Sequence, residues 1–395
     1  MTLTLSNEVS KIASRGRRLT FTSGSFCVGV AMRVTVEATT QGHRAYRLIG
    51  GAGESARARG LVNAAWYRTP LPRPVLKELA RRSDGPAIRD TLLWYLLILS
   101  AGVVAVLSVE SVWAIPAFLI YGTLYAGPAD SRWHECSHGT AFRTSWLNDL
   151  VYQLASFQVM RRPTVWRWSH ARHHSETLIT GRDPEIQVQV PLRPLAVLAD
   201  FIGLKLAPTE FVKSIVNASG RMIEDEKTFV PESEWPRVIR EARIWVAVFA
   251  AVTAAAVITS SWLPLLLIGL PSIYGAWLYN VFGLTQHACL PENVLDHRLN
   301  SRTVLINPAS RFLYWNMNYH IEHHMFPMVP YHGLPRLHET IEADCPPAYR
   351  SLWAAYREII PALWRQWRDP NYVVRRSWKR EGEFTGARPA DAHLD

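Results

Sequence analysis

Cysteine is scarce in this sequence, and its spacing is not that of a metal site or a disulfide framework. Only four cysteines occur among 395 residues, and no two of them form a C-x-x-C pair. They are Cys27, Cys136, Cys289 and Cys345. A disulfide-rich fold, a cysteine-bound zinc site and an iron–sulfur cluster are therefore not indicated. We expect the functional site to face a reducing compartment.

Basic residues are missing from two long stretches, although the net charge of the chain is +10. No Lys or Arg lies between Arg89 and Arg132, or between Arg243 and Arg298. Such segregation is typical of membrane proteins, whose basic residues collect on the cytoplasmic side. We therefore interpret the positive charge as a surface that faces anionic lipid headgroups, and not as a nucleic-acid-binding surface.

The two stretches without basic residues are also nearly free of acidic ones. Residues 91–129 contain one charged side chain, Glu110, and residues 244–284 contain none. As helices they would each be roughly 60 Å long, about twice the thickness of the hydrocarbon core of a bilayer. Each stretch is therefore predicted to form two spans, and buried helices of a soluble enzyme are the alternative. The predicted spans are 91–108, 112–128, 244–260 and 262–283.

The fold class that follows is an all-α integral membrane protein with four transmembrane helices in two hairpins. Each hairpin returns the chain to the same side, so both termini, residues 130–243 and residues 285–395 are predicted to be cytoplasmic, where the basic residues collect. Amphipathic segments in these parts are expected to form a cytosolic helical cap at the membrane surface, which carries the site. They are residues 61–89, 146–160, 195–219 and 351–367.

The ends of the chain differ from the middle in composition. Residues 1–60 are rich in Ser, Thr, Gly and Arg without a sustained period, and we recognise no secretory signal in them. We expect them to be disordered or to be an over-extended N-terminus, since Met32 is a second available start. Residues 61–378 are predicted to form one membrane domain, and residues 379–395 a C-terminal tail.

Histidine is concentrated in three short windows, which hold eight of the 14 histidines. The eight are His134 and His138, then His170, His173 and His174, and finally His320, His323 and His324. Since positions i, i+3 and i+4 share one face of a helix, the imidazoles of each window can converge on one point. Neutral imidazole is the commonest metal-binding side chain, and eight are too many for one ion. Two metal ions are therefore predicted.

The first window also fits a zinc-protease pattern. The stretch from His134 to His138 is H-E-x-x-H, in which two histidines bind zinc and the glutamate, here Glu135, is a general base. An intramembrane zinc metalloprotease is therefore the alternative from another reaction class, although it leaves six clustered histidines unexplained. A non-catalytic membrane binding protein is a third hypothesis, and it explains none of the eight.

The three windows and their positions resemble the histidine boxes of the membrane fatty acid desaturase superfamily, over roughly residues 90–340. The first box follows the first apolar hairpin, and the third follows the second hairpin. Residues 318–332 are similar to a bacterial branch that includes dihydrorhizobitoxine desaturase. The resemblance implies a non-haem di-iron centre, with dioxygen as co-substrate and the eight box histidines as iron ligands. It also implies one further ligand near the end of the fourth span, for which His287 and Asn280 are candidates.

The function implied by the resemblance is oxygen-dependent desaturation of a fatty acyl or lipid-like chain, an oxidoreductase activity. Hydroxylation and desaturation of a small amphiphile such as dihydrorhizobitoxine are alternatives within the same class. No catalytic residue beyond the metal ligands is expected. We find no haem motif, flavin-binding glycine-rich loop or cysteine cluster in the sequence. A separate ferredoxin, rubredoxin or cytochrome is therefore expected to supply electrons.

Side chains beside the boxes have predicted supporting roles. A basic surface of Arg161, Arg162, Arg167 and Arg172 is expected to attract an acidic electron carrier, with phospholipid contact as the alternative. Carboxylates near ligating histidines fix the imidazole tautomer by accepting a hydrogen bond. The candidates for this role are Glu135, Asp183 and Glu322. Tryptophans that flank two of the boxes are candidates for a wall against water; they are Trp133, Trp166 and Trp168.

Overall fold

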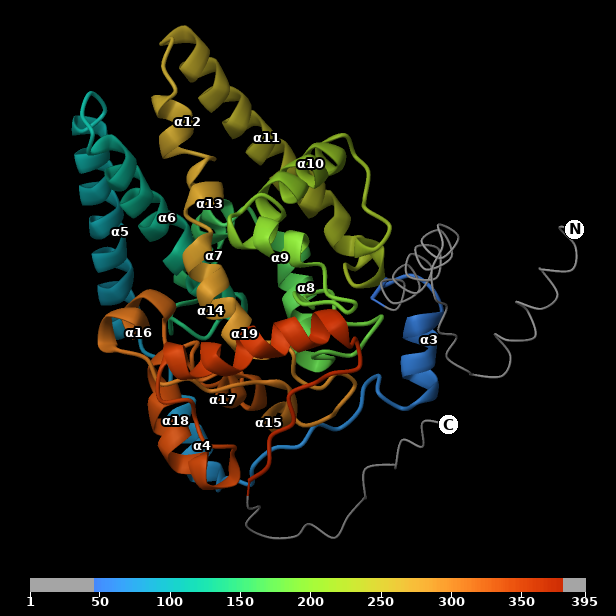
Figure 1. The fold of residues 1–395 in the computed structure, drawn as a ribbon. Coiled ribbons are helices and arrows are strands. Elements are labelled where there is room, and N and C mark those ends of the chain that lie inside the picture. Colours follow the sequence, from blue (N-terminus) through green and yellow to red (C-terminus); the bar gives the residue numbers. More distant parts are fainter. Residues whose placement is uncertain (1–45, 379–395) are drawn as a thin grey trace, which may run out of the picture. The chain divides into compact units, whose positions relative to one another are not determined.

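The computed structural model describes residues 46–378, so the predictions for residues 1–45 and 379–395 lie outside the described part. Within residues 46–378 the regular structure is helical, and no strand forms; two isolated β-bridges are present. The all-α part of the predicted fold class is confirmed. Figure 1 shows the long helices α5, α6 and α11 projecting to one side of the short helices α15, α17 and α18.

The first predicted hairpin is formed by α5 (Asp84–Leu107) and α6 (Ala114–Ser137), which pack together and are joined by a turn around Glu110. The indole N–H of Trp94 on α5 donates a hydrogen bond of 2.7 Å to the Leu124 carbonyl of α6. α6 continues past residue 128, where the predicted span ends, so His134 lies on the same helix as the apolar residues. The first histidine window is thereby held at the end of this helix pair.

The second apolar stretch is only partly continuous. α11 (Trp235–Ile258) is one long helix, but the predicted fourth span is divided into α12 (Leu263–Leu267), α13 (Pro271–Tyr274) and α14 (Trp277–His287). Gly269 has a φ of +95°, which glycine adopts without strain, and Pro271 has no N–H to continue a helix. These residues break the helix, so the fourth predicted span is three short helices.

Two helical segments of the described residues, Arg73–Leu107 and Glu232–Ile258, are long and apolar enough to cross a membrane. Only 22% of the apolar window of each is buried inside the protein, unlike the core helix of a soluble protein. Large apolar side chains on both segments are open at the surface: Leu99 is 66% exposed and Ile258 is 82% exposed. Contiguous apolar surface of this kind marks contact with a membrane or another protein.

Shorter helices pack around the ends of the long ones. The segments predicted to be amphipathic contain α4 (Arg73–Leu79), α7 (Ser145–Gln158), α9 (Pro194–Phe201), α10 (Leu206–Ala218) and α19 (Leu352–Arg368). Their helical structure is confirmed, while their position at a membrane surface stays a prediction. The remaining α-helices of the cap are α8 (Pro163–Ser175), α15 (His297–Asn300), α16 (Pro308–Tyr314), α17 (His320–Met325) and α18 (Leu334–Ile341).

A further helix, α3 (Gly51–Ala58), lies within residues 1–60, for which the sequence predicts disorder or an over-extended start. Its Ala56 packs with Leu61 and Ile179 in one apolar cluster. Tyr46 donates a hydrogen bond of 2.8 Å to Glu292. Because these side chains are covered by distant parts of the chain, residues 46–60 belong to the folded unit, and the predicted boundary at residue 60 is wrong.

Candidate metal centre

Four helices bring the predicted histidines together. His134 lies near the end of α6, with His138 directly after it, and His287 is the last residue of α14. The second window lies on α8 and the third on α17, and each covers about one helical turn, as the spacing predicts. All six residues of α17 are buried, so the third window is inside the protein.

The nine histidines form two groups, and the nitrogens that each group offers lie within 4.8 Å of one another. The first group consists of His134, His138, His170, His174 and His323. The second group consists of His173, His287, His320 and His324. The rings of His174 and His324, which belong to different groups, stack with their centroids 4.2 Å apart. The two groups therefore lie side by side.

Each H-x-x-H-H window contributes to both groups in the same way. His170 and His174, four residues apart, join the first group, whereas His173 between them joins the second. On α17 the first and last histidines of the window join the second group and His323 joins the first. Positions i and i+4 are about 40° apart around a helix, while position i+3 lies about 60° to the other side. One turn of helix thus supplies nitrogens to two neighbouring points.

The imidazoles within each group face one another through their Nε2 atoms. These atoms are 2.8 Å apart between His134 and His323, and 2.9 Å apart between His287 and His320. Bonds from a metal ion to imidazole nitrogen are about 2.0–2.1 Å long, so two nitrogens bound at right angles are about 3 Å apart. The nitrogen positions therefore fit one metal ion in each group.

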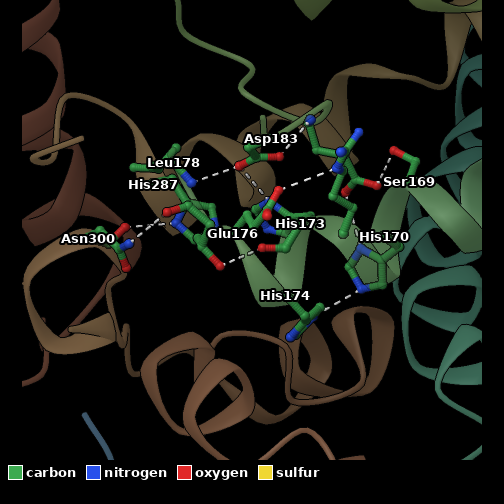
Figure 2. Close-up of polar contacts among 12 residues, drawn as sticks. Ser169, His170, His173, His174, Glu176, Leu178, Asp183, His287 and Asn300 are labelled. Atoms are coloured by element: carbon green, nitrogen blue, oxygen red, sulfur yellow. Dashed lines mark hydrogen bonds and ion pairs between the residues drawn. The ribbon is translucent and has the colours of Figure 1, made fainter. Parts of the chain in front are cut away.

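The outer nitrogens of two imidazoles on α8 meet carboxylates. His173 Nδ1 is 2.9 Å from Asp183 Oδ2 (Figure 2). His170 Nδ1 is 3.1 Å from Glu185 Oε2. Asp183 is itself held by the Leu178 N–H, which donates to the same oxygen at 2.7 Å. Acceptors at Nδ1 keep the ring proton there and leave the Nε2 lone pair for a metal ion.

Burial keeps most of these imidazoles neutral. It lowers the pKa of His170, His320 and His324 well below the usual value, and repulsion from neighbouring imidazoles lowers the pKa further. His173 differs: burial alone would lower its pKa, but the charge and hydrogen bond of Asp183 outweigh burial and raise it. A neutral imidazole has the free lone pair that metal binding requires.

His287 completes the second group, whereas the other candidate for the additional ligand does not. His287 Nδ1 is 2.7 Å from the Asn300 carbonyl oxygen, and its Nε2 faces the group. The side chain of Asn280 lies outside both groups: it accepts a hydrogen bond from Gln187 at 3.0 Å and donates one to the Asp200 carbonyl at 2.9 Å. The candidate role of Asn280 as a ligand is therefore not supported.

The prediction that Glu135 orients a ligand is wrong. Glu135 is fully buried, but its carboxylate accepts hydrogen bonds from Thr140 Oγ1 at 2.7 Å and from the Tyr331 N–H at 3.0 Å. It follows His134 directly in the chain, and one position is a rotation of 100° around a helix. The side chain therefore faces away from the histidine groups and ties α6 to the segment after α17.

The prediction that Glu322 accepts a hydrogen bond from a box histidine is also wrong. Glu185, which was not predicted, has this role. Glu322 lies beside His323 in the chain but pairs with His338 at 2.5 Å and with Thr303 at 2.5 Å. Glu185 follows the predicted Asp183 by two residues, in the sequence Asp-Pro-Glu, which was the only signal available for it. Asp183 is thus the one confirmed partner of the three predicted.

The four arginines predicted to attract an electron carrier are engaged in ion pairs. Arg162 is 3% exposed and pairs with Glu210 at 2.9 Å and with Glu226 at 2.5 Å. The other pairs are Arg161–Asp130, Arg167–Asp149 and Arg172–Glu176. The predicted open basic surface is therefore wrong, because these cations are neutralised by carboxylates on neighbouring segments.

Two of the three predicted tryptophans lie against the site. Trp133 is 2% exposed, and its ring centroid is 5.2 Å from that of His170. Trp166 packs edge-on against Trp133, with their centroids 5.7 Å apart. Trp168 is 37% exposed and points to the surface. The first group is thus covered on one side by Trp133 and Trp166.

A pocket of about 340 Å³ reaches the histidines. Members of both groups line it: His134 of the first group, and His173 and His287 of the second. Its other walls come from α14, the first half of α10 and residues 184–189. A molecule in this pocket would meet both groups at once.

The sequence matches the fatty acid desaturase family over residues 110–356, which is more than half of the chain. It is similar to the chloroplastic omega-6 fatty acid desaturases of Arabidopsis thaliana and Brassica napus, each 22% identical over 302 residues. These matches cover 69% of this chain but 57% and 58% of the relatives, so the chain spans less than two thirds of their length. Over 109 residues, 26% of this chain and 30% of the relative, it is 28% identical to the sn-1 acyl-lipid omega-3 desaturase (ferredoxin) of Nostoc sp. (strain 36). The chain belongs to the fatty acid desaturase family.

Proposed function

We propose that this protein is an oxygen-dependent desaturase, an oxidoreductase that introduces a carbon–carbon double bond into a fatty acyl or lipid-like chain. The observation that carries the proposal is the pair of adjoining histidine groups that line one pocket. Family membership and the names of the relatives support desaturation. Hydroxylation by the same site is the alternative within the class, since both reactions begin by removing hydrogen from a methylene carbon.

Two non-haem iron ions are the proposed cofactor, with dioxygen as co-substrate. The first group would hold one ion with five imidazoles, and the second group would hold the other with four. Imidazole ligands suit iron, and the clusters contain no thiolate that would favour softer metals. When bound, such a centre activates dioxygen and supplies the oxidising power that removes two hydrogen atoms from adjacent carbons.

The residues of the chain hold the ligands in position and exclude water. Asp183 and Glu185 fix the rings of His173 and His170 by accepting from their Nδ1 atoms. Trp133 covers the first group, and the burial of α17 keeps solvent from the third window. A substrate chain bound in the pocket would lie along α14 and reach members of both groups.

We further propose a membrane domain with four spans, formed by α5, the apolar part of α6, α11, and α12 to α14 together. It comprises the predicted residues 61–378 and also residues 46–60, which fold with them. The exposed apolar side chains of α5 and α11 support this, as does the absence of Lys and Arg from residues 90–131 and 244–297. The histidine groups and both termini would face the cytoplasm.

A separate electron donor and a lipid substrate are the proposed partners. The Nostoc relative is named as an acyl-lipid desaturase that uses ferredoxin, which supports a donor of that type. A rubredoxin or a cytochrome would serve the same purpose.

An intramembrane zinc protease is not favoured. Its general base would have to be Glu135, whose carboxylate is held by Thr140 and Tyr331 on the far side of α6. A single zinc site also leaves most of the nine grouped histidines without a role.

Metal analysis of the full chain purified in detergent tests the proposal. We expect about two irons per chain, and new double bonds in the lipids of an expressing host. His323→Ala removes a ligand of the first group and is expected to lose half of the iron or more, together with the activity. Asp183→Asn keeps the size of a side chain that orients a ligand, and should weaken iron binding about 10–100-fold.

The matched control is Asp149→Asn, since Asp149 is a 60% exposed carboxylate that pairs with Arg167 at the surface. This variant is expected to retain iron and activity. About one zinc per chain, unaffected by His323→Ala but lost in His134→Ala, would contradict the proposal and favour the protease.

A further inference from the structure

The pocket that reaches the histidine groups is lined by polar and apolar surface in about equal measure. Thirteen of its 29 lining residues carry a charged or amide side chain, whereas five are leucine, isoleucine or valine. An unsubstituted acyl chain in this pocket would displace water from polar groups without replacing its hydrogen bonds, which costs free energy. The lining therefore suits a substrate that brings hydrogen-bonding groups of its own.

The polar wall begins at the metal groups and runs outward along α14. Asn280, Gly283 and His287 share one face of this helix, and all three line the pocket. Asn280 is seven residues from His287, about 10 Å along the helix axis. Gln187 donates to Asn280 across this face at 3.0 Å, and a Cβ added at Gly283 would lie 3.6 Å from Gln187 Oε1. The glutamine thus lies over the glycine, between Asn280 and the histidines.

The charges of the pocket do not favour an anionic substrate group. Each Lys and Arg that lines it is already paired with a carboxylate: the pairs are Lys205–Asp200, Lys213–Glu210 and Arg161–Asp130. Glu185 and Glu292 also line the pocket, and neither forms an ion pair with Lys or Arg within residues 46–378. Uncharged or cationic groups are therefore better suited to this pocket than a carboxylate.

A strongly apolar groove exists in the protein, but it lies elsewhere. It has a volume of about 540 Å³, runs between α10 and α11, and is lined by residues such as Phe211, Ile215 and Phe249. None of the nine grouped histidines lines it. This apolar groove is thus separate from the histidine groups.

We propose that the substrate carries an uncharged or cationic hydrogen-bonding group, such as a hydroxyl or an amide, close to the carbons that are oxidised. Gln187 is the residue that selects for this group, and Asn280 holds the Gln187 amide in place by accepting its hydrogen bond. The inference rests on the proposed function, and it narrows the substrate from acyl chains in general to chains that are substituted near the reacting carbons.

A matched pair of probes tests this: methyl 3-hydroxydecanoate and methyl decanoate, which differ by one hydroxyl. Their binding to the iron-loaded full chain in detergent is measured as a concentration-dependent rise in the apparent Tm, which requires no turnover. We expect the hydroxy ester to bind about fivefold more tightly, as one additional hydrogen bond would give. Gln187→Leu and Asn280→Leu are expected to remove this difference.

Gln187 is exposed at the pocket, so its replacement should leave the fold intact even if Asn280→Leu does not. Gln153→Leu is the control, because it removes an amide from α7 outside the pocket and should keep the difference. Equal binding of the two esters, binding of neither, or a difference that survives Gln187→Leu would contradict the inference. If the protein then holds two irons and desaturates unsubstituted acyl chains, this inference alone fails. If it holds no iron, the proposed function fails with it.

Discussion

At the scale of single residues, one loop aligns imidazoles of both histidine groups. Asp183 accepts from His173 of the second group, and Glu185 accepts from His170 of the first. The two carboxylates are linked, because the Glu185 N–H donates to Asp183 Oδ1 at 2.8 Å. The loop after α8 therefore sets the orientation of the two groups relative to each other, which a separate acceptor for each ring would not do.

Glu292 gives a prediction for the pH dependence of stability. It is a partly buried carboxyl outside both groups, and desolvation raises its pKa from 4.5 to about 7. The folded state therefore holds a proton that the unfolded chain releases, so stability is lost as pH rises from about 5 to about 7, by on the order of 3 kcal/mol. Glu292→Gln keeps an acceptor for Tyr46 and has no proton to lose. We expect its apparent Tm to decline less than that of the wild type between pH 5 and 8, and parallel profiles would contradict this.

The grouping of the box histidines was predictable from sequence because their spacing fixes a helical face before any tertiary contact forms. Closeness in the sequence gives a wrong prediction for Glu135 and Glu322. Each is adjacent to a histidine in the chain, but its side chain is rotated by about 100° around the helix from that histidine. Glu185 reaches His170 only because the loop after α8 folds back over the helix, and no local period encodes such a return. The partners of the ligands therefore depend on tertiary structure, as do the ion pairs of Arg161 and Arg162.

At the scale of elements, the packing of α6 against α13 depends on two glycines and yields a prediction. A Cβ at Gly275 would lie 1.9 Å from the carbonyl oxygen of Gly122, so no side chain fits between the two helices. Gly275→Ala is expected to push α13 from α6, to cost about 1–3 kcal/mol or more, and to displace α14 with His287. A lower apparent Tm and a loss of iron would be measured. Gly85→Ala, where a Cβ meets only Ser83 Oγ at 4.0 Å, is the control, and equal behaviour of the two variants would refute the argument.

The long helices could be predicted because uncharged stretches report where apolar helices form. The interruption of the fourth predicted span between α12 and α14 could not be predicted from hydropathy, since the hydropathy is uniform across it. Gly269 and Pro271 are visible in the sequence, but whether they bend a helix or end it depends on what packs beside them. In this protein α6 packs beside this segment, and Gly122 of α6 has no side chain to keep α13 at a distance.

At the scale of the whole molecule, the ends of the two helix pairs differ chemically. The turn before α6 carries Trp113, which is 70% exposed, and the turn before α12 carries Trp262, which is 73% exposed. Exposed tryptophan at the ends of apolar helices is typical of a membrane–water interface. The histidine groups lie at the opposite ends of α6 and α14, next to the segments that contain the basic residues. These features support the proposal that both hairpins cross a membrane in the same sense, with the tryptophan turns outside.

Labelling of single cysteines in intact cells tests this topology. Cys136, Cys289 and Cys345 are buried, so only Cys27 needs replacement by serine to give a silent background. A membrane-impermeant maleimide is expected to label Ser111→Cys and Ser260→Cys, in the two turns, from outside the cell. Ser219→Cys, at the exposed end of α10, should react only after lysis. Labelling of Ser219→Cys but not Ser111→Cys in intact cells would reverse the orientation. Equal protection of all three positions until lysis would show that neither hairpin crosses the membrane, and the exposed apolar faces of α5 and α11 would then require a protein partner.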